Sequence, residues 1–270
     1  MEPFKEEFTE ILSAFLDAYN YEGTYEENDT IIAYIPIENY SLNALNEIRS
    51  ILKNLDCSLS WKLEDVSEQN WNLIWERNFK PVIISDRCIV RAPFHQEYPH
   101  IPLEIIIEPK MSFGTGHHQT TSLMMEQMLL IDFKNKNVLD MGCGTGVLGI
   151  LASKLGASKV VGVDIDNWSY LNTLENIERN SIKNMLVYQG GSESIPKEKF
   201  QIVLANINLN VLLDQINEYS KITEKGSILL LSGIIKENQK IILEMAEKNF
   251  FKLQNKYEQD EWLMLMFVRN

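Results

Sequence analysis

The stretch Val138–Asp166 limits the possible folds of this chain more than any other part of the sequence. It reads as an apolar strand that carries Asp140, a loop with glycines at alternate positions, an apolar helix that stops at Gly156, and a β-branched strand that ends at Asp164. This order predicts one half of a doubly wound α/β sheet. Glycines allow a sharp turn and let a ligand approach backbone N–H groups. We therefore expect a ligand where the first strand meets its helix.

Composition and cysteine usage narrow the class of protein. The 270 residues allow one large domain or two. No apolar run is as long as a membrane span, and the acidic opening Met1–Glu10 is unlike a signal peptide, so we expect a cytoplasmic protein without a membrane partner. The three cysteines are far apart, odd in number and share no ligand spacing with the four histidines. This pattern predicts reduced thiols and no metal site.

The charge is negative and uneven. The whole chain carries a net charge of −13, of which −10 falls in residues 1–65. A negative protein is a poor binder of the nucleic-acid backbone, so we expect no direct nucleic-acid partner. The acidic front either serves solubility or attracts a basic partner. The sequence leaves both interpretations open.

Residues 1–65 predict a small α+β domain that is ferredoxin-like if a strand precedes its first helix. An amphipathic helix is expected over Lys5–Tyr19, and Ser41 is placed to cap a second helix. The other expected elements are strands over Tyr21–Tyr25, Thr30–Ile35 and Leu59–Leu63, a turn over Glu26–Asp29, and the second helix over Leu42–Leu55.

Asp65–Phe79 predicts a helix between two domains. Trp71 and Trp75 are four residues apart and share one helical face, and Pro81 ends the helix. We therefore expect an N-terminal domain over residues 1–65, a linker helix over 66–80 and a larger α/β domain over 81–270. The strands expected in the larger domain are Val82–Ser85, Cys88–Ala92, Glu104–Glu108, Val138–Met141, Lys159–Val163, Met185–Gln189, Phe200–Ala205, Ser227–Leu231, Lys252–Glu258 and Trp262–Val268. Its expected helices are Gln119–Leu130, Val147–Leu155, Trp168–Asn180, Leu209–Tyr219 and Lys236–Lys248.

A second glycine-rich stretch, Pro109–Thr121, precedes one of these helices. Gly114 and Gly116 flank Thr115 at its centre. Such a turn can present free N–H groups and hydroxyls to a ligand, or it can simply cap the helix after a flexible loop. The stretch alone does not decide between these two interpretations.

Two ligands compete for the first loop. Gly144–Gly149 matches the dinucleotide fingerprint, with Asp164 twenty residues after Gly144. A pyrophosphate on this loop would, however, be repelled by Asp140, whereas S-adenosylmethionine carries an ammonium and a sulfonium and no phosphate. Asp164 can accept hydrogen bonds from both ribose hydroxyls. Asp140 either holds loop amides or lies near the methionine ammonium, and Cys143 is interpreted as a small loop residue.

Several stretches together resemble the class I S-adenosylmethionine-dependent methyltransferases, and within them the ribosomal protein L-eleven methyltransferase (PrmA) family. They are Trp71–Phe79, Phe113–Thr121, Asp140–Gly146 with Asp164, Ala205–Ile207 and Ser232–Ile234. The resemblance implies a Rossmann-like doubly wound sheet with a small N-terminal substrate-recognition domain that swings on the linker. It also implies transfer of methyl groups to lysine side chains and the N-terminal α-amine of a basic ribosomal protein. We expect a monomer.

The same resemblance implies roles for particular residues. Phe113–Gly116 is the loop expected to close over the methionine end of the cofactor, and Asn206 is placed to orient the target amine or that end of the cofactor. The implied S-adenosylmethionine contacts are Phe113, Gly114, Thr115, Thr121, Gly142, Gly144, Asp164 and Asn206.

The chain also departs from the family pattern. It begins almost at the first helix, which implies that the opening strand of the family is missing or short. Gln119 replaces a usual proline, and Asn208–Asn210 is polar where small residues are usual. Three alternatives therefore stay open. They are a small-molecule methyltransferase, a nicotinamide-dependent oxidoreductase based on Gly144–Gly149, and a non-catalytic module that binds a basic partner.

Overall fold

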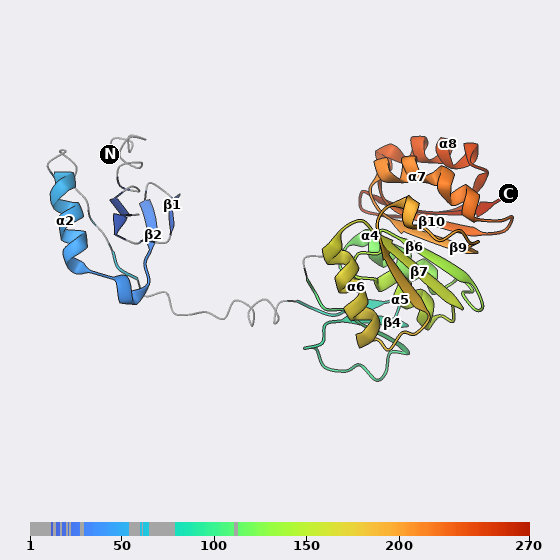
Figure 1. The fold of residues 1–270 in the computed structure, drawn as a ribbon, viewed down its shortest axis with the longest axis horizontal. Helices are drawn as coiled ribbons and strands as arrows, with labels where there is room; N and C mark the ends of the chain where they lie inside the picture. Colours follow the sequence, from blue (N-terminus) through green and yellow to red (C-terminus); the bar gives the residue numbers. More distant parts are fainter. Residues whose placement is uncertain are drawn as a thin grey trace. The chain divides into compact units, whose positions relative to one another are not determined.

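The computed structural model describes residues 12, 15–16, 18–19, 21, 23–27, 30–53, 60, 62–64, 79–110 and 113–270. The chain divides into two compact units, Met1–Gln69 and Asn70–Asn270 (Figure 1). The linker helix predicted over residues 66–80 lies outside the described residues except for Phe79 and Lys80, which are in neither helix nor strand. The domain limits at residues 65 and 81 therefore stay a prediction.

The first unit contains an antiparallel pair of strands. Strand β1, Gly23–Glu27, pairs with β2, Thr30–Tyr34, and Glu27 lies opposite Thr30. The predicted turn over Glu26–Asp29 was therefore too long, because cross-strand pairing continues through Glu26 and Glu27. The described residues of the predicted first helix, Leu12, Phe15, Leu16 and Ala18, are helical.

An amphipathic helix follows these strands. After the short 3-10 turn η1, Ile37–Asn39, helix α2 spans Leu42–Lys53. The predicted cap is confirmed, because Ser41 Oγ accepts a hydrogen bond from Ala44 N–H at 3.4 Å. Ile48 of α2 packs in one core with Leu12 and Leu16. Ser60 and Lys62–Glu64 are in no strand, and the rest of the strand predicted over Leu59–Leu63 lies outside the described residues.

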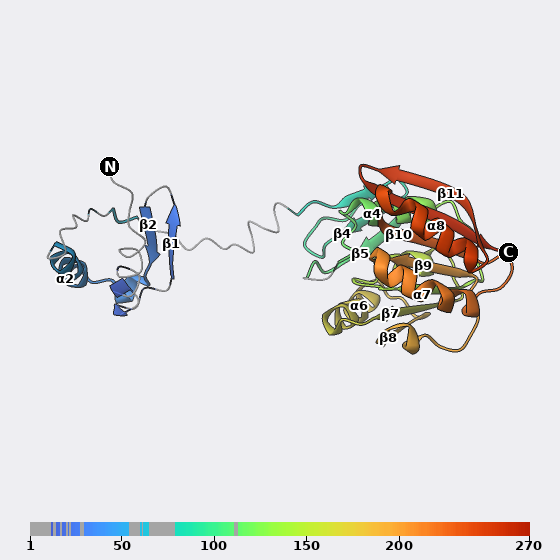
Figure 2. The same ribbon diagram turned by 90° about the horizontal axis from the view of Figure 1, so that it is seen from above.

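The second unit is built on a seven-stranded sheet with the order β11-β12-β10-β9-β6-β7-β8. Five neighbouring strands are parallel, and β12 runs antiparallel to both of its neighbours, β10 and the edge strand β11. Figure 2 shows β11 and β8 at the two opposite edges. The strands are β6 Asn137–Met141, β7 Lys159–Asp164, β8 Met185–Gln189, β9 Ile202–Asn206, β10 Ile228–Ile235, β11 Phe251–Gln259 and β12 Trp262–Arg269.

Helices cover both faces of this sheet, and each face has its own core. Figure 1 shows α7 and α8 together on one side and α5 and α6 on the other. Alternate residues of one strand enter different cores. Val138 packs with α4 and α5, whereas Leu139 packs with α7 and α8. Burial on both faces explains why the central strands are continuous apolar runs. The helices are α4 Gln119–Met128, α5 Val147–Lys154, α6 Asn167–Arg179, α7 Leu209–Ile222 and α8 Gln239–Lys248, with 3-10 turns η2 Ser192–Ser194 and η3 Lys236–Asn238.

Strand β10 is longer than the sequence predicted. We expected it to end at Ser232–Gly233, but it continues to Ile235. The register against β12 shifts between Ser232 and Ile234, which is a bulge at Gly233. Gly233 has φ +83°, and a Cβ there would lie 2.3 Å from the carbonyl oxygen of Ile207. The glycine thus bends the strand at a close backbone contact instead of ending it.

A small three-stranded sheet precedes the large one. It has the order β3-β4-β5, with β3 Val82–Ile84, β4 Cys88–Arg91 and β5 Leu103–Ile106. The buried Arg91 makes an ion pair with Glu104, with 2.6 Å between Nε and Oε1. A Cβ on Gly116 would lie 3.4 Å from Val90 Cβ and 3.7 Å from Val82 Cβ, so these two side chains lie beside the glycine. The small sheet therefore supports the second glycine-rich stretch.

Candidate active site

The loop between β6 and α5, residues 142–146, is called the inner loop below. It is held by Asp164 at the end of the neighbouring strand β7. Asp164 Oδ2 accepts a hydrogen bond from Gly144 N–H at 2.8 Å, and its Oδ1 accepts one from Asp166 N–H at 3.0 Å. Asp164 is largely buried, at 9% exposure. The predicted ribose-binding carboxylate therefore also fixes the backbone of the inner loop.

Two glycines of the inner loop lie where no side chain fits. Gly142 has φ +69°, and a Cβ there would lie 2.2 Å from Ile207 Cγ2. Gly144 has φ +57°, and a Cβ there would lie 2.3 Å from the carbonyl oxygen of Phe113. Glycine is required at both positions because the neighbours approach so closely. The inner loop thus contacts both other segments that the sequence assigned to the site.

Residues 113–116, called the outer loop below, are attached to the inner loop by one residue. Thr145 N–H donates to the carbonyl oxygen of Phe113 at 3.0 Å, and Thr145 Oγ1 donates to that of Gly114 at 2.6 Å. Thr145 is fully buried, whereas the Phe113 ring is exposed. Thr115 Oγ1 lies 3.1 Å from His117 Nδ1, so this side-chain contact stays within its own glycine-rich stretch and does not reach the inner loop.

Asn206 ends β9 beside the start of α4. Its Nδ2 donates to Thr121 Oγ1 at 3.2 Å. Thr121 is fully buried, and the buried Asn206 Oδ1 has no hydrogen-bond partner among the described residues. A buried amide oxygen without a partner is costly, so this atom indicates a position where a ligand N–H can bind. The structure thus brings the predicted Thr121 and Asn206 into direct contact.

Two further groups at this end of β6 are buried, Asp140 within the strand and Cys143 in the inner loop. Asp140 Oδ2 accepts a hydrogen bond from Gly149 N–H at 2.8 Å, so this side chain holds a backbone amide of helix α5, which follows the inner loop. Burial, with a contribution from the charge of Asp164, raises the pKa of Asp140 to about 7 although the Gly149 bond opposes the shift. Burial also raises the pKa of Cys143 far above its usual range, so this thiol is a poor nucleophile, as predicted.

Three buried asparagines of the α6 region were not predicted from the sequence. Asn176 Nδ2 donates to the carbonyl oxygen of Thr145 at 2.9 Å, and Asn172 and Asn180 lie one turn away on either side. Thr173 Oγ1 also donates to the carbonyl oxygen of Gly144 at 2.8 Å. The available signal was the spacing of asparagines by four residues on a helix whose other face is exposed.

The described residues show neither a metal site nor a membrane-spanning helix. No group of three or more His, Cys, Asp or Glu side chains in the described part of the chain is arranged to hold a metal ion. Within the same residues, no helix is long and apolar enough to cross a membrane.

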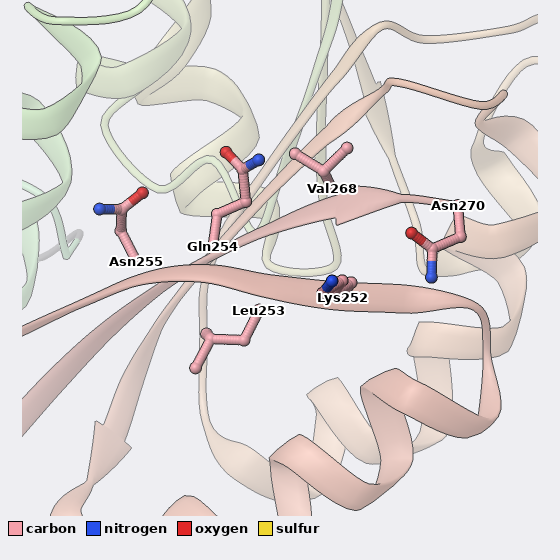
Figure 3. A pocket seen from close by; sticks show the side chains of 6 residues that line it. All are labelled: Lys252, Leu253, Gln254, Asn255, Val268 and Asn270. Carbon is pink, nitrogen blue, oxygen red and sulfur yellow. The ribbon is translucent and has the colours of Figure 1, made fainter.

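A cavity of about 440 Å³ is lined by residues of β11 and β12 and by Asn270 (Figure 3). It lies at the carboxyl end of β12, which is the sheet end opposite the inner loop because β12 runs antiparallel to β10. Its side chains do not converge on one point in Figure 3.

Comparison with known proteins identifies the family. The sequence profile of the family described as ribosomal protein L11 methyltransferase (PrmA) matches residues 5–270. A ribosomal protein L11 methyltransferase of Porphyromonas gingivalis is 43% identical over 265 residues, covering 96% of this chain and 90% of that protein. The chain belongs to the PrmA family. A family member from Bacteroides fragilis is 35% identical over 268 residues, covering 98% of this chain and 96% of that protein.

Solved structures agree with this assignment. The crystal structure of a ribosomal protein L11 methylase from Lactobacillus delbrueckii subsp. bulgaricus has a TM-score of 0.66 and 27% identity, and covers 71% of this chain and 99% of that chain. A methyltransferase from Pyrococcus furiosus has a TM-score of 0.52 at 18% identity and covers 61% of this chain and 89% of that one, which supports the fold alone. The predicted Rossmann-like methyltransferase fold is confirmed. Membership in the PrmA family makes the chain a methyltransferase and decides against the nicotinamide-dependent oxidoreductase.

Proposed function

We propose that this chain transfers methyl groups from S-adenosylmethionine to ribosomal protein L11, at lysine side chains and at the N-terminal α-amine. The names of the relatives from Porphyromonas gingivalis and Bacteroides fragilis support this substrate. The observation that carries the site assignment is the buried Asn206 Oδ1, which has no partner among the described residues while Thr121 holds the amide nitrogen. An intact, oriented amide at this position favours catalysis over a non-catalytic binding module.

The residues around the inner loop fit S-adenosylmethionine. Each Asp164 oxygen accepts one backbone hydrogen bond and retains a second lone pair, so both can accept a ribose hydroxyl. Asp164 places a carboxylate at the end of β7, which suits a cation and opposes a pyrophosphate. The proposed contacts remain Phe113, Gly114, Thr115, Thr121, Gly142, Gly144, Asp164 and Asn206. When bound, S-adenosylmethionine supplies a methyl group on a positively charged sulfur.

The obstacle to this chemistry is the proton on the target amine. A lysine amine has a pKa of about 10.4 and an α-amine one of about 8, so few lysine amines are neutral at pH 7. A site that removes the amine from water lowers its pKa and favours the neutral form. No strong base is then needed. The carboxamide of Asn206 can orient either the amine or the methionine end of the cofactor, and positioning of this kind supplies most of the rate enhancement.

The first unit is the proposed substrate-recognition domain. Residues 1–65 carry most of the negative charge of the chain, and a basic ribosomal protein is a complementary partner. We further propose that the protein acts as a monomer in the cytoplasm without contacting nucleic acid directly. Size-exclusion chromatography with light scattering tests the monomer.

The main test is a methylation assay with labelled S-adenosylmethionine and purified L11 in the presence of ribosomal RNA. We expect label on L11, and mass spectrometry then counts the methyl groups on each amine. Asn206→Ala should lower kcat about 100-fold, because it removes the amide that positions the reacting groups. Asn208→Ala is the matched control, since Asn208 caps α7 two residues later through its bond from Val211 N–H. Label on RNA, or no label on L11, would contradict the proposal.

A further inference from the structure

Three buried asparagines line the face of α6 that points into the protein. Asn172 and Asn176 lie within α6 and Asn180 directly follows it, and their exposures are 1%, 0% and 8%. Residues four apart on a helix lie above one another, so the three amides form a row. Buried amides are costly unless they are hydrogen-bonded. The partners of the row therefore show what it holds in place.

Two members of the row bind the chain at and after β5. Asn180 Oδ1 accepts from Ile106 N–H at 2.9 Å, and Asn180 Nδ2 donates back to the Ile106 carbonyl at 2.6 Å. Asn176 Oδ1 accepts from Glu108 N–H at 2.9 Å. Four helical residues rise about 6.0 Å and two strand residues about 6.6 Å, so successive asparagines match alternate residues of an extended chain. The row therefore acts as a partner for the open edge of β5 and for Glu108 beyond it.

Asn176 has a second set of contacts, on the inner loop. Both hydrogens of its Nδ2 are used, one to the carbonyl oxygen of Thr145 at 2.9 Å and one to Asn172 Oδ1 at 3.1 Å. Asn172 Nδ2 is buried and has no partner in the described part of the chain. Asn172 thus acts through its oxygen, which helps to fix the orientation of the Asn176 amide. One side chain therefore joins Glu108 to the inner loop.

These contacts connect Glu108 to the start of the outer loop through Asn176 and Thr145. Glu108 precedes the segment that leads to Phe113, and its N–H is held by Asn176. The far end of the same segment is held by Thr145, which donates to the carbonyls of Phe113 and Gly114. Asn176 in turn holds the Thr145 carbonyl. Both ends of the segment are thus fixed to two residues that bind each other.

We propose that Asn176 is a positioning residue for the cofactor site. It sets the outer loop in register with the inner loop through Thr145, without contacting the cofactor itself. This inference rests on the proposed function, because it requires that the cofactor bind between the two loops. Its consequence is specific. Loss of the Asn176 amide donor should weaken cofactor binding more than loss of an equally buried donor that does not reach the inner loop.

The test compares Asn176→Asp with Asn180→Asp in the full-length chain. Each change keeps the oxygen that accepts from the segment of Ile106–Glu108 and replaces a donor that makes two hydrogen bonds. Only the Asn176 donor reaches the inner loop, because the Asn180 donor binds Ile106 and the Asn176 carbonyl. Titration calorimetry with S-adenosylhomocysteine should show binding about tenfold weaker for Asn176→Asp and less than about threefold weaker for Asn180→Asp. Thermal unfolding should show a similar fall in Tm for both.

A second pair of variants tests the link between the two loops if Asn176→Asp does not fold. Thr145→Val removes the hydroxyl that donates to Gly114 but keeps the branched shape, and Thr145→Ser restores the hydroxyl. Thr145→Val should weaken S-adenosylhomocysteine binding about fivefold and Thr145→Ser should recover most of it. Equal losses for Asn176→Asp and Asn180→Asp, or no recovery with Thr145→Ser, would overturn the inference. If the unaltered chain did not bind S-adenosylhomocysteine, the proposed function would fail instead.

Discussion

The inner and outer loops both contain glycines next to a helix, but they are held in different ways. The inner loop is braced from several sides by Asp164, by Thr173 and by Asn176. The outer loop is tied to it through Thr145, and its Phe113 ring is 54% exposed. A similar sequence signature therefore produces a buried loop with several side-chain hydrogen bonds in one place and a partly exposed loop in the other.

The difference separates two tasks. A buried loop with many hydrogen bonds can hold a cofactor in one position at little entropic cost on binding. An exposed loop attached at a few points can adjust to a protein substrate. Changes in the inner loop should therefore affect cofactor binding most, and changes in the outer loop should act mainly where they disturb its attachment to the inner loop.

The strongest test of this comparison is alanine at one glycine of each loop. In Gly144→Ala the new Cβ meets the backbone oxygen of Phe113 at 2.3 Å, whereas in Gly116→Ala it meets Val90 side-chain atoms at 3.4 Å. Both positions have positive φ, so both variants are strained and differ mainly in the clash. We expect S-adenosylhomocysteine to bind at least about 100-fold more weakly to Gly144→Ala, but only a few-fold more weakly to Gly116→Ala. Calorimetry on both variants measures this, and equal losses would show that the two loops are equally rigid.

The next largest effect is expected at the support of the inner loop. Asp164 now accepts hydrogen bonds from the backbone N–H groups of Gly144 and Asp166. In Asp164→Asn, the side-chain NH₂ replaces one of the two accepting oxygens, so one of these N–H groups loses its acceptor. The unpaired amide should cost about 1–3 kcal/mol of folding stability, and cofactor binding should weaken by about 30-fold. Urea unfolding and calorimetry separate the two losses. Asp166→Asn is the control, because the amide oxygen can still accept the Ser169 N–H that caps α6.

The sequence predicted the inner loop well because its elements are local. The succession of strand, glycine and helix patterns along the chain predicts that Gly144 lies in a loop and that Asp164 ends the next strand, as observed. This prediction needs no knowledge of which strands pair. The end of β10 was predicted wrongly for the opposite reason. Ser232 and Gly233 look like a strand end, but pairing with β12 continues past a bulge. A bulge depends on the partner strand, so it is not visible in the sequence of one strand.

The asparagine row of α6 also depends on partners that are distant in the sequence, so its role was not predicted. A polar residue on a helix is more often exposed than buried. Asn176 becomes informative only when Glu108 and Thr145 are seen on either side of it, 68 and 31 residues away in the chain. Sequence reasoning therefore found the residues proposed to face the cofactor, and missed those that hold them in place.

A smaller effect is expected from the buried carboxyl group of Asp140, which lies in β6 just before the inner loop. The pKa of Asp140 is raised to about 7 in the folded protein, against about 4 in the unfolded chain. Its stabilising contribution is therefore complete below about pH 4 and is lost as the pH rises through about 7. Asp140→Asn keeps an oxygen for Gly149 N–H but does not titrate. Between pH 5 and pH 7 the unaltered chain should lose up to about 2 kcal/mol relative to Asp140→Asn, as measured by urea unfolding. Parallel pH profiles for the two proteins would show that the carboxylate is ionised in the folded state.

The smallest effect concerns the acidic first unit, which lies outside both loops. If its charge attracts basic L11, then Glu6→Gln with Glu7→Gln should raise the KM for L11 about twofold at low salt and leave kcat unchanged. The control is Glu244→Gln with Glu247→Gln, which removes the same charge from the exposed side of α8 in the second unit. Exposed charges are screened within about 8 Å at physiological salt, so the difference between the two pairs should vanish near 0.5 M salt. If both pairs raise the KM equally, net charge alone is sufficient and the first unit has no special part in attracting the substrate. A difference that survives high salt would instead indicate direct contact between these side chains and L11.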